Sequence, residues 1–162
     1  MQFQFLLPTK IVMEPGLRQR TGEHLLGLGL SHVLLVTDPG VKNAGLLDSI
    51  YASLEQAGIR YDEIADVKPN PRSEDVNRAA QLYRGKGIDG VLAVGGGSAM
   101  DAAKAISVLL THDGIVEDYE GAFALKNAVL PIVAIPTTAG TGSEVTFFSV
   151  ITDTRRQFKM SL

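Results

Sequence analysis

The residues best suited to hold a ligand form a glycine-rich run, Gly95-Gly96-Gly97-Ser98, between a short apolar segment and a helical pattern. Adjacent glycines let a backbone approach a phosphate without side-chain clashes, and a helix N-terminus offers unpaired N–H groups and a positive dipole end. The same residues also suit a plain turn, with Ser98 as N-cap and Asp101 completing a capping box. The G-x-G-x-x-G pattern is only partly met because Met100 holds its third place, and no Walker-type phosphate loop is present. By itself, the run leaves both interpretations open.

A second run of small and hydroxylated residues, 136–146, follows another apolar segment and contains Thr137, Thr138 and Thr141. Hydroxyl groups donate and accept hydrogen bonds, so such a loop can cup a ligand, although a polar turn has the same composition. Two loops of this kind at the carboxyl ends of strands in one sheet favour ligand binding, because open α/β sheets bind their ligands there.

Three isolated polar residues have two interpretations each. Asp38 follows an apolar run, where a carboxylate suits the two hydroxyls of an adenosine ribose and repels a 2′-phosphate, but Asp-Pro-Gly is also turn chemistry. Asn70 lies between two prolines, in a rigid turn that need have no other role. Lys159 follows the pair Arg155-Arg156, and these residues form either a solvated turn or, through Lys159, a phosphate contact.

The composition excludes several other kinds of chemistry. Because the chain has no cysteine, it has no disulfide, thiolate metal site, iron–sulfur cluster or cysteine nucleophile. His24, His32 and His112 are scattered without metal-ligand spacing, and no G-x-S-x-G hydrolase motif is present. With 15 basic and 18 acidic residues the net charge is −3, which argues against nucleic-acid binding. The apolar runs are too short to span a membrane and no signal peptide is recognised, so a cytoplasmic protein is expected.

The elements that must position these residues alternate between short strands and amphipathic helices. Apolar runs predict strands at 32–37, 90–94 and 130–135, and the segment 60–64 is interpreted as a further strand that follows the first of these. Helical spacing predicts helices over 17–28, 45–57, 73–84 with Ser73 as N-cap, and 98–110. Small hairpins are expected near both ends, from 3–6 with 10–13 and from 147–152 with 158–162. The alternation requires crossover connections, so the predicted fold class is α/β, a Rossmann-like parallel sheet with helices on both faces.

The runs 95–104 and 136–146 together resemble those of the iron-containing (group III) alcohol dehydrogenases. Asp38, Asn70-Pro71, the segment 118–121 and the segment 150–153 also fall where that family has counterparts. The resemblance covers essentially the whole chain, but only the N-terminal, nucleotide-binding half of the family. It implies that residues 1–162 form one dinucleotide-binding domain.

The resemblance implies an NAD(P)-dependent oxidation of an alcohol or diol, or reduction of an aldehyde, with NAD favoured over NADP by Asp38. It assigns cofactor contacts to residues of both loops and of the isolated positions: Asp38, Asn70, Gly96, Gly97, Ser98, Asp101, Thr137, Thr138, Thr141, Val150 and Lys159. In the family, Fe²⁺ or another divalent metal is held by one Asp and three His of a helical C-terminal domain. We expect this chain to end before them as a truncated sequence, without catalytic or metal-binding residues, and to be inactive by itself.

Other functions remain open at this point. A related enzyme of the same architecture, such as a glycerol dehydrogenase or dehydroquinate synthase, is one alternative, although the 136–144 run resembles the alcohol dehydrogenases more closely. A stand-alone nucleotide-binding module without catalysis is another. The expected partners are the dinucleotide and, in the complete enzyme, a small alcohol or aldehyde, with no nucleic acid and no membrane. Residues 2–6 alternate polar and apolar, as an edge strand that pairs with a second subunit in a homodimer would.

Overall fold

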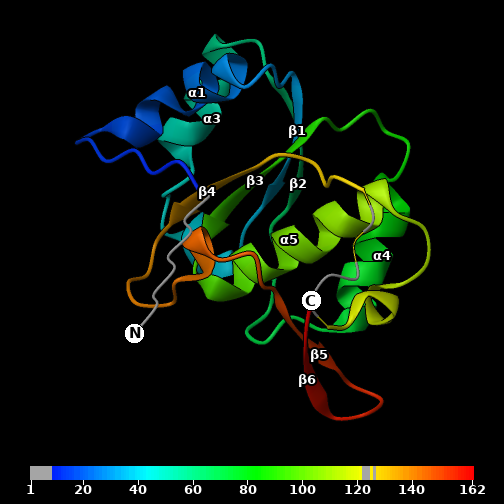
Figure 1. Cartoon of the computed structure of the whole chain (residues 1–162). Helices are drawn as coiled ribbons and strands as arrows, with labels where there is room; N and C mark the ends of the chain where they lie inside the picture. The colour runs from blue at the N-terminus through cyan, green and yellow to red at the C-terminus, as the bar shows by residue number, and fades with distance from the viewer. Residues whose placement is uncertain (1–8, 122–124, 126) are drawn as a thin grey trace, which may run out of the picture.

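The computed structural model describes residues 9–121, 125 and 127–162 of the 162-residue chain, and its centre is a four-stranded sheet (Figure 1). The strands are β1 (His32–Val36), β2 (Arg60–Ile64), β3 (Gly90–Gly95) and β4 (Ile132–Pro136), in the order β2-β1-β3-β4. All pairs are parallel, and Leu35 of β1 lies opposite Glu63 of β2 and Leu92 of β3. The predicted α/β, Rossmann-like class is confirmed.

Helices cover both faces of this sheet because alternate residues of a strand point to opposite sides. Leu34 and Val36 pack in one apolar core with α4 (Ser73–Tyr83) and α5 (Gly97–Thr111). Val33 and Leu35 pack in a second core with α1 (Thr21–Gly27) and α3 (Asp48–Gln56). Figure 1 shows the two helix pairs on opposite sides of the sheet. β1 and β3 are buried along their whole length, as central strands of a parallel sheet are.

Four short helical elements complete the described chain: η1 (Leu17–Arg20), α2 (Pro39–Asn43), η2 (Val116–Tyr119) and η3 (Ser143–Val145). The predicted helix over 17–28 is divided into η1 and α1. α2 was not predicted, because Asp-Pro-Gly is typical of a turn. Asp38 caps this helix by accepting a hydrogen bond from the N–H of Val41 (3.0 Å). No helix in the described ranges is long and apolar enough to cross a lipid bilayer.

Two predicted helix caps are wrong. α4 begins at Ser73 itself, and Arg72 holds the N-cap position without a side-chain hydrogen bond. α5 begins one residue earlier than predicted, at Gly97, so Ser98 is not its N-cap and Asp101 forms no capping box. The Ser98 hydroxyl instead accepts a hydrogen bond from a backbone N–H group 28 residues earlier in the chain. A tertiary contact has therefore replaced the local one.

The predicted hairpin at the C-terminal side is confirmed. Its strands are β5 (Val150–Asp153) and β6 (Phe158–Ser161), which pair antiparallel. Ile151 and Met160 are fully buried and join the core beneath α4 and α5. The N–H of Thr152 donates to the carbonyl of Pro71 (2.8 Å), which anchors the hairpin on the turn before α4.

The first strand of the predicted N-terminal hairpin, residues 3–6, lies outside the described part of the chain, as does the whole of the expected edge strand 2–6. Residues 10–13 are described and form no strand, and their side chains are exposed to solvent.

Candidate functional site

The two predicted ligand loops and Asp38 meet at the carboxyl edge of the sheet, where β1 and β3 lie side by side. The chain leaves β1 towards β2 on one side and later places β3 on the other side. This edge is therefore the topological switch point, where open α/β sheets bind their ligands. A Cβ atom placed on Gly95 would lie 3.0 Å from Oδ2 of Asp38, so one carboxylate oxygen faces the glycine loop.

Gly95 lets the chain turn tightly from β3 into α5. It has a φ of 154°, and a Cβ atom there would lie 2.7 Å from the Cβ atom of Ala99. The N–H of Met100 bonds the carbonyl of Gly96 (3.2 Å), at the start of the helical hydrogen bonding. The N–H groups of residues 97–99 precede this bond, at the positive end of the α5 dipole. Such a helix start favours an anionic ligand.

The loop after β4 lies against the glycine run. A Cβ atom on Gly96 would lie 3.1 Å from Oγ1 of Thr138, and one on Gly97 would lie 3.4 Å from the Cβ atom of Thr141. The N–H of Thr137 donates to a carbonyl of β3 (2.9 Å), which fixes the start of the loop. All three threonines are exposed, so the loop borders the glycine run with hydroxyl groups that solvent can reach.

A third segment joins the site through Asn70. Its N–H donates to Oγ of Ser98 (3.3 Å), and its side-chain Oδ1 accepts a hydrogen bond from Nζ of Lys159 (2.7 Å). Asn70 has a φ of 54°, a left-handed conformation that asparagine tolerates better than most residues. These contacts connect the first turn of α5, the turn before α4 and β6. They also place an ammonium group near the N-terminus of α5.

Asp101 makes contacts that differ from its predicted role. Its carboxylate accepts a hydrogen bond from the hydroxyl of Ser143 (2.5 Å) and lies 3.9 Å from Nζ of Lys104. Nζ of Lys104 also donates to the Ser143 hydroxyl (3.1 Å) and to the carbonyl of Phe148 (2.8 Å). Asp101 and Lys104 therefore fasten the loop after β4 to α5. A direct contact between Asp101 and a cofactor stays a prediction.

Lys104 is a residue of the candidate site that the sequence analysis did not single out. Burial lowers its pKa, against the opposing effect of the Asp101 and Glu144 carboxylates. An acidic residue three positions before a lysine on a helix is a recognised pair, and this spacing was the available signal. It did not reveal that the pair reaches a loop some forty positions later.

Val150 lies at the start of β5 and is 41% exposed. The hydroxyl of the preceding Ser149 donates to the carbonyl of Asp101 (2.7 Å), which ties this end of the hairpin to the first turn of α5. Phe147 and Phe148 beside it are also exposed. The structure thus brings Val150 to the α5 side of the site through its neighbour. Every other predicted site residue is joined to the site by a contact of its own.

A metal ion has no matching set of ligands in the part of the chain that the structure describes. No group of three or more His, Cys, Asp or Glu side chains there is arranged to hold one. His32 bonds Asp62 through its Nε2 atom (2.9 Å) at the other end of the sheet, and His112 is buried. The described residues therefore fit an anionic ligand and do not fit iron, and no metal-dependent step is assigned to them.

The parallel sheet, with a glycine-rich loop that opens α5 at the switch point, defines a Rossmann-like α/β domain. The family model of the iron-containing alcohol dehydrogenases matches residues 8–162, and the chain belongs to this family. The predicted family resemblance is thereby confirmed.

The relatives cover this chain almost completely. A choline dehydrogenase from Bacillus subtilis (strain 168) is 49% identical over 160 residues, which are 97% of this chain and 40% of that protein. Among solved structures, the NADH-dependent butanol dehydrogenase A from Thermotoga maritima matches with a TM-score of 0.92 and 33% identity, over 99% of this chain and 41% of that one. A sulfoacetaldehyde reductase from Bifidobacterium kashiwanohense, in complex with NAD⁺, matches with a TM-score of 0.88 and 31% identity, over 100% and 43%. This chain spans about 40% of the length of these relatives.

Proposed function

We propose that this chain binds NAD at the carboxyl edge of its sheet, as the nucleotide-binding portion of an iron-type alcohol dehydrogenase. The proposal rests on one observation: the Asp38 carboxylate lies beside the glycine run at the switch point, where α5 begins. NAD, when bound, supplies the acceptor or donor of the hydride in alcohol oxidation or aldehyde reduction. The solved relative that contains NAD⁺ supports this choice of cofactor.

Each predicted site residue then has a role that its position supports. The N–H groups around Gly96, Gly97 and Ser98 hold the pyrophosphate at the positive end of α5. Lys159, placed by Asn70, adds a positive charge for the same phosphates. We assign the nicotinamide half of the cofactor to the remaining residues, either by direct contact or through the loop after β4. These are the hydroxyl groups of Thr137, Thr138 and Thr141 and the side chains of Asp101 and Val150.

Asp38 is assigned the adenosine ribose. Its Oδ1 atom accepts the N–H of Val41, while Oδ2 faces the glycine loop and is placed to accept hydrogen bonds from ribose hydroxyls. A groove of about 600 Å³ opens at Pro39, next to Asp38 in the chain, and its lining mixes apolar side chains such as Ile64 and Val67 with charged ones such as Lys68 and Asp75. Its apolar side chains, beside the ribose position, suit a purine base. The same carboxylate disfavours the 2′-phosphate of NADP, so NAD is the expected cofactor.

Binding and orientation of the dinucleotide are the functions that we assign to these residues. Because the chain spans about 40% of its relatives, we assign the metal ion and the activation of the alcohol to residues outside this stretch. Among substrates, 49% identity with a choline dehydrogenase supports choline beside simple alcohols and diols.

Calorimetry of the folded 162-residue chain with NAD tests the proposal. We expect weak binding, with ADP-ribose binding nearly as well as NAD, since the charges of Asp38 and Lys159 and the N–H groups of the glycine run are assigned to the adenosine and pyrophosphate. Nicotinamide mononucleotide should bind far more weakly. The absence of any heat of binding at millimolar NAD would contradict the proposal.

We expect no turnover of ethanol, propanediol, choline or butanal by the same sample with added Fe²⁺ or Zn²⁺. Metal-dependent turnover would show that the chemistry has been assigned to the wrong residues.

A further inference from the structure

We propose that Arg156 is a positioning residue for cofactor binding: it fastens the turn of the β5–β6 hairpin and so holds Lys159 against Asn70 at the edge of the site. This inference rests on the proposed function, since it takes the ammonium group of Lys159 to face the bound cofactor. No part of the inference requires Arg156 to touch the cofactor itself.

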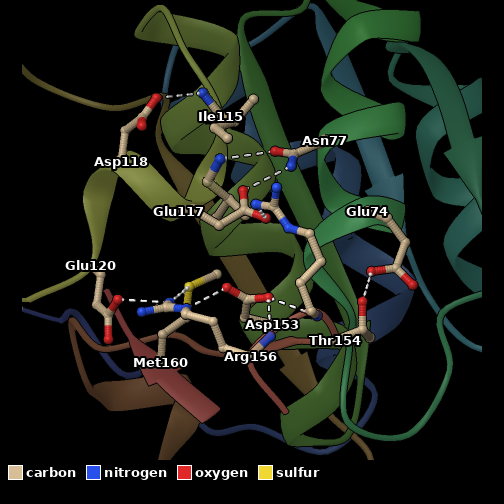
Figure 2. A network of polar contacts seen from close by, with 12 residues as sticks. Glu74, Asn77, Ile115, Glu117, Asp118, Glu120, Asp153, Thr154, Arg156 and Met160 are labelled. Atoms are coloured by element: carbon tan, nitrogen blue, oxygen red, sulfur yellow. Dashed lines mark hydrogen bonds and ion pairs between the residues drawn. The ribbon is translucent and has the colours of Figure 1, made fainter. Parts of the chain in front are cut away.

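Arg156 joins the hairpin turn to η2 (Figure 2). Its Nε atom donates to Oδ2 of Asp153 (2.5 Å), and its Nη2 atom lies 2.8 Å from Oε2 of Glu120, just after η2. The planar guanidinium group is suited to holding two carboxylates in fixed directions, which a lysine ammonium group is not. Arg156 therefore fixes the turn relative to the rest of the domain as well as internally.

Asp153 is the centre of this turn. It is 1% exposed, and its Oδ1 atom accepts hydrogen bonds from the N–H groups of Arg155 (2.9 Å) and Arg156 (3.1 Å). Hydrogen bonds from the Arg156 side chain and from this backbone hold the pKa of the Asp153 carboxyl below its ordinary value. Figure 2 shows Thr154 of the same turn reaching Glu74 of α4, with a distance of 2.8 Å between the two oxygens. The turn is thus fixed at several points.

The geometry of the turn sets the register of β6, and the register decides where Lys159 points. Lys159 pairs with Thr152 across the hairpin, and Met160 pairs with Ile151. Met160 is fully buried while Lys159 is exposed and bonded to Asn70. A slip of one residue would exchange the two faces of β6, because side chains alternate along a strand. The contacts of Arg156 therefore bear directly on the position of the Lys159 ammonium group.

The neighbouring Arg155 offers a matched control. It lies in the same turn and carries the same charge, but its side chain is 73% exposed and its ion pair with Glu117 spans 3.2 Å. Because the Arg155 guanidinium group is largely open to solvent, its pair with Glu117 is screened and contributes little to stability. Arg155→Met therefore removes a positive charge from the turn and leaves the contacts of Arg156 in place.

The test compares NAD affinity and the reactivity of the Lys159 amine across six proteins: the unchanged chain, Arg156→Met, Arg156→Lys, Arg155→Met, Lys159→Met and the double variant Arg156→Met/Lys159→Met. We expect Lys159→Met and Arg156→Met each to weaken NAD binding by roughly fivefold, the order expected for one partly exposed charge contact. Arg155→Met should change the affinity by less than about twofold. In the double variant Arg156→Met/Lys159→Met, the affinity should match that of Lys159→Met alone, because both changes remove the same contact.

Amine labelling followed by mass spectrometry gives a readout that needs no cofactor. Without NAD, Lys159 should be labelled several times faster in Arg156→Met than in the unchanged chain, and Arg156→Lys should lie between them. Circular dichroism checks that every variant is folded, and Arg156→Lys replaces Arg156→Met if the latter does not fold.

The possible failures are distinct. If the unchanged chain binds no NAD, the proposed function falls and the inference falls with it. If NAD binds and Lys159→Met weakens it while Arg156→Met does not, only the positioning role of Arg156 is overturned. The positioning role would also be overturned if Arg156→Met weakened NAD binding by the same factor in the unchanged chain and in Lys159→Met. Such a result would show that the effect of Arg156 on NAD affinity does not depend on Lys159.

Discussion

At the scale of single residues, Asp38 combines a structural task with its proposed one. Its Oδ1 atom caps α2, while Oδ2 faces the glycine loop. The two readings that the sequence left open, turn residue and ribose ligand, are therefore compatible, because each uses a different oxygen. The nearby Lys42 ammonium group is paired with the Glu63 carboxylate, so its charge is already compensated.

Asp38→Asn separates the two tasks of this residue. Asparagine caps helices as well as aspartate does, so the free energy of unfolding should change by less than about 1 kcal/mol. Loss of the negative charge should relieve the repulsion of a 2′-phosphate and raise the ratio of NADP to NAD affinity by about tenfold. Calorimetry with both cofactors measures this ratio, and Asp48→Asn, in the first turn of α3, is the control. An unchanged ratio would leave Asp38 as a helix cap only.

Two glycines of the loop should respond to alanine in different ways. A methyl group on Gly97 would lie 3.4 Å from Thr141, an ordinary contact, so Gly97→Ala should keep the stability of the fold. It should weaken NAD binding by roughly tenfold, because the methyl group stands where the pyrophosphate approaches the backbone. Gly95→Ala places a methyl group 2.7 Å from Ala99 and should cost about 1–3 kcal/mol of folding free energy. Urea denaturation and calorimetry distinguish the two effects, and unchanged NAD affinity in Gly97→Ala would place the pyrophosphate elsewhere.

At the scale of elements, the strands were predictable and the helix caps were not. β1, β3 and β4 are short apolar runs, so their positions follow from the sequence alone. β2, at the edge of the sheet, carries charged residues and is only partly buried, and its position followed from its place between two helical segments. The N-caps of α4 and α5 were assigned one or two residues too late, because Ser73 and Ser98 have good N-cap chemistry. Ser98 instead accepts the N–H of Asn70, a partner that no local pattern reveals. α2 was missed because capped helices of five residues and turns begin with the same residues.

The packing of α1 on α3 offers a test of stability that is separate from binding. A Cβ atom on Gly22 of α1 would lie 2.3 Å from the carbonyl oxygen of Ser53 in α3, and the Gly22 N–H donates to the Ser53 hydroxyl (2.9 Å). Gly22→Ala should destabilise the fold by about 1–3 kcal/mol, because the helices must separate, and leave NAD affinity unchanged in the folded fraction. Gly27→Ala in the same helix meets no atom within 4 Å and should be neutral or slightly stabilising. Thermal unfolding of both variants measures these effects. A neutral Gly22→Ala would refute the close approach of α1 to α3.

At the scale of the whole molecule, it was easier to predict which residues belong to the candidate site than how the fold brings them together. The two loops and Asp38 were named from residue type and position at strand ends, whereas Asn70 and Lys159 were assigned to the cofactor through the family resemblance. Their joining was not, because the contact between Asn70 and Lys159 depends on the docking of β5–β6 onto the turn before α4. The contacts of Asp101 and Lys104 with Ser143 depend in the same way on how the loop after β4 folds back over α5.

The acid stability of the molecule should reflect the carboxylates that the fold holds ionised. The pKa of Asp153 is lowered from 3.8, chiefly by the hydrogen bond from Arg156. The pKa of Glu117 is lowered from 4.5: burial acts in the opposite direction, and the hydrogen bonds from Asn77, Ser73 and the backbone together with the charge of Arg155 outweigh it. A lowered folded pKa means that the unfolded chain binds protons more readily. The contribution to stability is complete above the unfolded values and is lost as the pH falls through the lower folded ones. Stability should therefore decline with falling pH below about 4.5.

Asp153→Asn tests this acid dependence. The difference in unfolding free energy between the unchanged chain and the variant should be largest near neutral pH and shrink as the pH falls below 3.8. Urea denaturation between about pH 2 and pH 7 measures it. Asp113→Asn, at an exposed side chain, is the control. A difference that stays constant across this range would show that the Asp153 charge does not contribute.

The contact between Asn70 and Lys159 joins residues that are 89 positions apart. The site can therefore be assembled only after the ribosome has synthesised both residues. At the usual rate of synthesis of about 5–20 residues per second, a ribosome needs roughly 4–18 s to extend a chain from one to the other. During that interval β3 and the glycine loop are added to β1 and β2, and contacts of such long range also form slowly once the residues are available. A nascent chain thus acquires these strands and the glycine loop first and the contact between Asn70 and Lys159 afterwards, so the proposed site is assembled only late in the synthesis of this stretch.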